Sequence, residues 1–163
     1  MLNITGKISA AIYTPGEDVK HVNWKSNKLQ YTGADVIGQL LAGRHVAPTH
    51  VYIEHSDSDT IPTYGNDSSG YYENETVDYE RVPLALNPSL SGSDENYNTN
   101  VVSFLAQSSE IPAERKILGV AIVSVIDGND VIISRGYFNP VIDQPAAPKK
   151  VLVRWDITIE VPS

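Results

Sequence analysis

The segment from Lys150 to Val161 alternates apolar and polar residues with one interruption, at Leu152. The apolar row occupies the odd-numbered positions Val151, Val153, Trp155, Ile157, Ile159 and Val161. Because successive side chains of a β-strand point to opposite faces, this alternation predicts a strand with one face in a core and the other in water. A similar alternation runs from Leu2 to Ile12, so the sequence predicts a protein built on β-sheet.

The strongest turn signal is Asp127-Gly128, which lies between the apolar runs 117–126 and 131–138. Asp-Gly readily adopts the left-handed backbone of a two-residue hairpin, so the two runs are expected to pair. The first run is apolar on both faces, as in a strand at the middle of a sheet that is covered on each side. Further strands are expected over residues 22–29, 51–55, 76–86 and 101–106. The predicted fold class is therefore mainly β, an antiparallel two-sheet sandwich that could take a jelly-roll form.

One short α-helix is expected near residues 33–42, because Ile37, Leu40 and Leu41 share a stripe and Gly43 follows as a stop. Pro83 is expected at a sheet edge, since proline cannot donate to a hydrogen-bond ladder. Residues 140–148 are rich in proline and predict an extended crossover to the last strand.

Two long polar segments, residues 56–75 and 87–100, are expected to be loops. Connections above roughly 12–15 residues are uncommon and often functional, so contacts with partners are expected there. Tyrosine supplies rigid, amphipathic contact area, and five tyrosines lie in or beside these segments. The candidate partner-binding residues are Tyr64, Tyr71, Tyr72, Tyr79 and Tyr97. Strand tyrosines also commonly cover the edge of a core, and the sequence alone leaves that alternative open.

Length and charge exclude several classes of protein. The 163 residues fit a single domain, residues 1–163, and the 20 acidic against 12 basic residues give a net charge of −8. Such a chain repels a phosphate backbone, so no nucleic-acid partner is expected. The longest apolar run, 117–126, is too short to cross a bilayer as a helix, so no membrane association is expected. The N-terminus lacks the features of a signal peptide, which predicts a protein that is made and kept in a cytosol.

No motif for catalysis, cofactor binding or metal binding stands out. His45, His50 and His55 lie five residues apart, a spacing that puts successive side chains on opposite faces of a strand. Asp57 and Asp59 resemble the start of a calcium loop but lack its later ligands, and a loose surface calcium site is left open. Both the Gly-x-Ser-x-Gly motif and a phosphate-binding glycine loop are missing. The sequence therefore predicts a protein that is not an enzyme and that has no cofactor.

Segments spread over most of the chain carry a family resemblance: Gly33–Gly43, Val51–Glu54, Tyr79–Leu84, Ile117–Val120, Ser134–Phe138 and Leu152–Ile159. They include a helix that closes on a Leu-x-Gly stop, an Arg-x-Pro-Leu strand and a last strand built around Trp155. In these features the chain resembles virion structural proteins of tailed bacteriophages. The resemblance implies a small β-rich accessory protein assembled in many copies on a particle.

The function expected on this basis is that of a capsid decoration (cement) protein, trimeric, located in the virion. It would bind the major capsid protein or neighbouring virion proteins and stabilise the capsid lattice. A neck or tail accessory protein of the same virion class is one alternative. A carbohydrate-binding β-sandwich module is another, and it would need exposed Trp or Tyr platforms; Trp155 is expected to point inward, while Trp24 is left open.

Overall fold

The computed structural model describes residues 3–13, 20–21, 25–29, 37–44, 47–57, 77–143 and 149–162. The described strands are β1 (Asn3–Tyr13), β2 (Lys20–His21), β3 (Lys25–Leu29), β4 (Pro48–Ser56), β5 (Asp78–Pro83), β6 (Ala85–Leu86), β7 (Gly92–Ser93), β8 (Thr99–Ile111), β9 (Lys116–Ile126), β10 (Asn129–Asp143) and β11 (Lys149–Glu160). Residues 37–41 form a helical turn, and η1 (Pro88–Leu90) is a short 3-10 helix.

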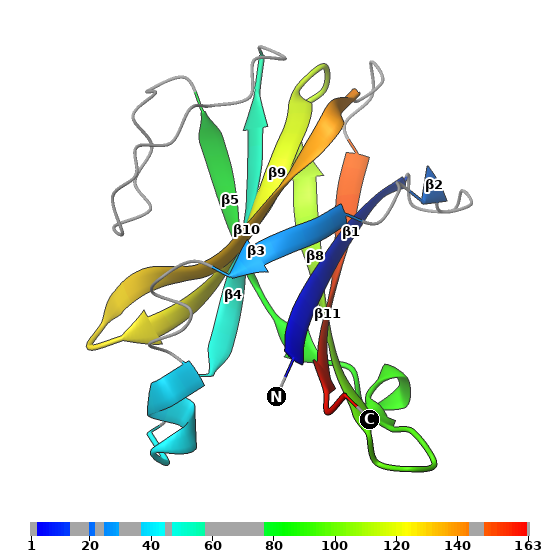
Figure 1. Cartoon of the computed structure of the whole chain (residues 1–163). Helices are drawn as coiled ribbons and strands as arrows, with labels where there is room; N and C mark the ends of the chain where they lie inside the picture. Colours follow the sequence, from blue (N-terminus) through cyan, green and yellow to red (C-terminus); the bar gives the residue numbers. More distant parts are fainter. Residues whose placement is uncertain are drawn as a thin grey trace.

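The strands form two antiparallel layers that face each other (Figure 1). One layer has the order β5-β4-β9-β10 and the other β1-β11-β8-β6. On one side β3 joins the layers, because it pairs with both β10 and β1. On the other side the chain itself crosses from β5, which pairs with β4, to β6, which pairs with β8. The predicted mainly β, two-sheet sandwich with one short helix is confirmed.

β11 fills the role that its sequence pattern predicts. It lies between β1 and β8, with Ile8 opposite Trp155 on one side and Phe104 opposite Trp155 on the other. Val151, Val153 and Trp155 are buried between the layers. Ile157 and Ile159 continue this row but are only half-buried, and Val161 is exposed because the strand ends at Glu160. The prediction that the whole odd-numbered row is shielded is therefore wrong at Val161.

The Asp127-Gly128 hairpin is confirmed. Asp127 and Gly128 have φ angles of 51° and 80°, the left-handed conformation that a two-residue turn of this kind requires. β9 lies between β4 and β10 and is buried on both faces from Ile117 to Ser124. Its outer face packs in a second apolar cluster with Tyr52 of β4 and Ile132 of β10.

Gly119 of β9 occupies a position where a side chain does not fit. A Cβ built there would lie 2.5 Å from the carbonyl oxygen of Gly136 and 2.8 Å from Cδ1 of Tyr137. Since one of these contacts is backbone, β10 itself would have to shift. We expect Gly119→Ala to lower the free energy of unfolding by about 1–3 kcal/mol, the usual cost of overpacking. Urea unfolding measures this, and Gly38→Ala, where nothing lies within 4 Å of the added Cβ, is the matched control. Equal stability of the two variants would contradict the close approach of β10.

Several predicted boundaries change. The strand expected over 76–86 is two strands, because the chain turns from one layer to the other at Leu84, whose N–H donates to the Thr49 carbonyl. Pro83 does lie on an edge strand, as expected. The crossover expected over 140–148 is wrong in its first part, since β10 runs on to Asp143. Residues 87–100 are not a plain loop but contain η1 and β7. Residues 144–148, most of 56–75, and Trp24 lie outside the described residues.

Candidate functional site

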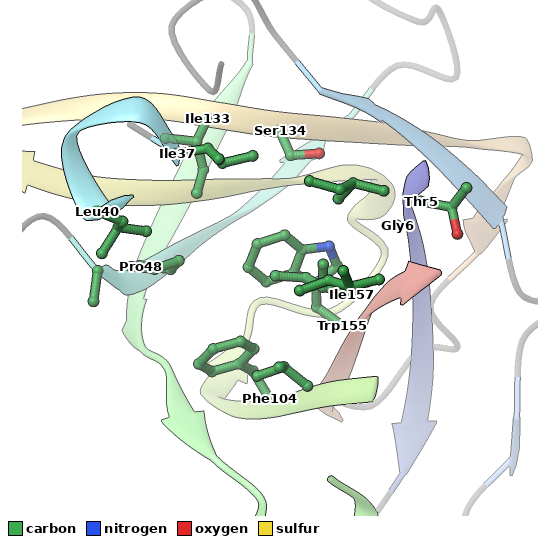
Figure 2. A pocket seen from close by; sticks show the side chains of 14 residues that line it. Thr5, Gly6, Ile37, Leu40, Pro48, Phe104, Ile133, Ser134, Trp155 and Ile157 are labelled. Atoms are coloured by element: carbon green, nitrogen blue, oxygen red, sulfur yellow. The ribbon is translucent and has the colours of Figure 1, made fainter. Parts of the chain in front are cut away.

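An apolar cavity of about 310 Å³ lies between the two layers at one end of the sandwich (Figure 2). Its wall comes from β1, β8 and β11 on one side and from β10 and the start of β4 on the other. Ile37 and Leu40, from the helical turn, complete the wall. None of the described residues that line this cavity is charged. The site therefore suits an apolar group rather than an ion or a charged substrate.

Trp155 and Phe104 form the aromatic part of the wall. Their rings stack with centroids 5.5 Å apart, and Trp155 is 3% exposed. Within the described part of the chain, the indole Nε1 of Trp155 is buried and has no hydrogen-bond partner. Buried polar groups in proteins are nearly always paired, so this nitrogen is an unusual feature of the wall.

Exposed apolar side chains surround the same end of the molecule. Among the described residues, eight large apolar side chains are exposed, and all but Tyr79 belong to segments at this end: Ile4, Leu40, Leu41, Leu86, Leu90, Tyr97 and Val161. We call these seven residues the apolar end. In Figure 1 the helical turn, the start of β1, the end of β11 and the segment that contains η1 all lie at the lower end of the view. Strand register agrees, because Ile4 pairs with Ile159 and the Val161 N–H donates to the Asn98 carbonyl.

The structure separates the two predicted tyrosines that it describes. Tyr97 lies in the turn before β8, is 83% exposed, and has a φ of 58°. It belongs to the apolar end. Tyr79 of β5 lies elsewhere, with its ring tilted against that of Tyr52 and the ring centroids 4.3 Å apart. Tyr64, Tyr71 and Tyr72 lie outside the described residues.

A polar cluster lies beside Tyr79 on the outer face of β4 and β5. Arg81 makes two hydrogen bonds to the carboxylate of Asp130, at 2.7 and 2.9 Å, and the Tyr52 hydroxyl donates to the same carboxylate. The Arg81 hydrogen bonds, with help from Tyr52, lower the pKa of Asp130. Burial and the hydrogen bond to Asp130 raise the pKa of Tyr52. Because Arg81 and Asp130 are partly exposed and their charges are balanced, we assign the cluster a role in holding β4, β5 and the β9–β10 hairpin together.

A second polar cluster holds the end of β4. Arg115 donates from Nε to Nδ1 of His55 at 3.1 Å and from Nη1 to Asp57 at 2.9 Å, and it also pairs with Asp78. Asp57, one of the two candidate calcium ligands, is therefore in an ion pair with Arg115, and Asp59 lies outside the described residues. Within the described ranges, no three His, Asp or Glu side chains are grouped so as to hold a metal ion.

This second cluster predicts a dependence of stability on pH. Burial, and then the charge of Arg115, lower the pKa of His55, while Asp78, Glu80 and Asp57 act in the opposite direction. Between the folded and unfolded pKa values the unfolded chain binds more protons, so the contribution of His55 is present above the unfolded pKa and is lost as the pH falls. We expect wild-type Tm to fall more steeply than that of His55→Gln between about pH 7 and about pH 5. Calorimetry measures both profiles, and parallel profiles would contradict a neutral, buried His55.

The sequence alone did not reveal the cavity. Its residues come from segments far apart in the chain, and each has an ordinary packing role when taken singly. One signal was present: the apolar row of the last strand continues through Ile157 and Ile159 after the core residues end at Trp155. No helix in the part of the chain that the structure describes is long and apolar enough to cross a membrane.

Comparison with protein-family models found no match, and neither did comparison with curated proteins or with solved structures.

Proposed function

We propose that this protein is a structural component of a tailed-phage virion, a capsid decoration (cement) protein that acts by binding neighbouring virion proteins as an oligomer. The observation that carries this proposal is the apolar end. Seven large apolar side chains stay exposed around one end of a sandwich whose layers are otherwise closed on both sides. Large exposed apolar side chains that gather at one end of a molecule, instead of lying scattered over its surface, are typical of a contact with another protein.

In this role the protein would act as a rigid domain with one contact surface, the apolar end. Antiparallel ladders and the β5–β6 crossing fix the shape of the sandwich, so little ordering entropy is lost when it binds. Leu41, 84% exposed, and Tyr97, 83% exposed, are large side chains that gain most from being covered. In a symmetric particle, many modest contacts of this kind add through multivalency.

A neck or tail accessory protein would use the same surface, so the two virion roles differ in location rather than in chemistry. Electron microscopy of virions purified from infected cells tests the proposal. We expect trimers of the chain at regular positions on the capsid lattice, with the apolar ends of neighbouring copies packed against each other. A ring at the neck or tail would favour the alternative. Absence of the chain from purified virions would overturn both.

A further inference from the structure

We propose that the cavity beside Trp155 binds a neutral, mainly apolar small molecule that carries one hydrogen-bond acceptor. This inference goes beyond the virion role and does not depend on it. A cavity of about 150 Å³ holds a benzene molecule. By that scale, the volume of about 310 Å³ accommodates a ligand of roughly twice the size of benzene. It also lies at the lower end of the range of natural ligand pockets.

The wall of the cavity determines the charge of the ligand. Among the described residues, the 14 that line it include no Asp, Glu, Lys, Arg or His. A charged group that entered would lose its hydration without gaining an opposite charge, and this excludes fatty-acid carboxylates and amines as preferred ligands. The stacked rings of Trp155 and Phe104 add flat, polarisable surface that suits an aromatic or aliphatic body.

The indole nitrogen of Trp155 determines where the acceptor would lie. Nε1 is a donor only, and it is buried without a partner in a side chain that is itself 3% exposed. In Figure 2 this nitrogen lies on the side of Gly6 and Thr5, away from Leu40 and Pro48. The nitrogen is covered by the wall, so an acceptor reaches it when the bound ligand displaces the neighbouring apolar side chains. The ligand would then place its acceptor near Trp155 and its apolar part toward the helical turn.

Two probes of equal non-hydrogen atom count separate the acceptor from the apolar body. Butyrophenone carries a carbonyl oxygen, and pentylbenzene has none. We expect butyrophenone to bind the wild-type protein about tenfold more tightly, because only it can accept from the indole N–H. In Trp155→Phe, which keeps an aromatic ring but removes the donor, this ratio should fall below one, because the carbonyl of butyrophenone is then buried without a hydrogen-bond partner. An equal affinity of the two probes for the wild-type protein would overturn the proposal.

The indole N–H also reports the interaction directly. The sequence has two tryptophans, Trp24 and Trp155. The substitution Trp24→Phe therefore leaves Trp155 as the single source of an indole ¹H–¹⁵N signal. Butyrophenone should move that signal downfield, whereas pentylbenzene should not. An unmoved signal at saturating butyrophenone would contradict the assigned hydrogen bond.

A pair of adjacent substitutions tests the location. Val102 lines the cavity, while Val101 precedes it on β8, points to the other face of the strand and does not line the cavity. We expect Val102→Phe to weaken binding of both probes by more than tenfold and Val101→Phe to leave it within about twofold. If both variants bound butyrophenone equally well, the cavity would not be the site.

Discussion

Replacing Trp155 with alanine should lower the free energy of unfolding by about 3–5 kcal/mol, among the largest effects of any single substitution in this chain. The side chain is 3% exposed, belongs to the main core cluster and stacks on Phe104. A large-to-small change costs more when the surroundings cannot collapse into the space. Here the removed volume would join the cavity of about 310 Å³, and both flanking strands are fixed by their ladders.

Urea unfolding followed by far-UV circular dichroism measures this loss. Tyr97→Ala is the control, because Tyr97 is 83% exposed and its substitution should change stability by no more than about 0.5 kcal/mol. A loss below about 1 kcal/mol for Trp155→Ala would mean that the indole does not close the core at this end.

Removing one member of the buried Glu54–Arg135 pair should be similarly costly. Glu54 of β4 is fully buried, the Arg135 side chain of β10 is 6% exposed, and Arg135 Nε lies 3.2 Å from Glu54 Oε1. Glu54→Gln keeps the shape of the side chain but removes the charge that faces the guanidinium. Since removing one charge of a buried ion pair is strongly destabilising, we expect a loss of about 3–5 kcal/mol.

The double variant Glu54→Leu with Arg135→Met separates burial from pairing. Replacing both partners by apolar side chains of similar volume is often neutral or stabilising, so the double variant should be more stable than Glu54→Gln. A double-mutant cycle compares this double variant with the single variants Glu54→Leu and Arg135→Met. The free energies of unfolding, measured in urea, give the coupling between the two positions. Losses that simply add would contradict a direct ion pair.

Local sequence pattern predicted the elements whose formation depends only on their own residues. The alternation in β11 and β1 needs only the two-residue period of a strand, and Asp127-Gly128 needs only turn geometry. The predicted strand boundaries that were wrong depend on tertiary contacts. The chain changes layer at Leu84 because its N–H finds the Thr49 carbonyl, and no local signal marks that partner.

The candidate site was harder to predict for the same reason. Leu40, Phe104 and Trp155 lie far apart in the sequence and meet because the helical turn, β8 and β11 converge at one end of the sandwich. The tyrosine criterion found Tyr97, which belongs to the apolar end, but it also selected Tyr79, which packs against Tyr52 at the polar cluster. Composition therefore identified a kind of contact residue but not the surface that such residues share.

Contacts between copies of the chain at its apolar end determine the oligomeric state, which size-exclusion chromatography with light scattering measures. The chain has a mass of 17.8 kDa, and the trimer proposed for the decoration protein would have three times that mass. Leu41→Glu with Leu90→Glu places charges on two exposed positions of this end, and Gln107→Glu adds a charge on an exposed position of β8 outside it. We predict a trimer for the wild-type protein and for Gln107→Glu, and a monomer for the double variant. A wild-type protein that stays monomeric at every concentration, or a double variant that remains trimeric, would show that the apolar end does not hold copies of the chain together.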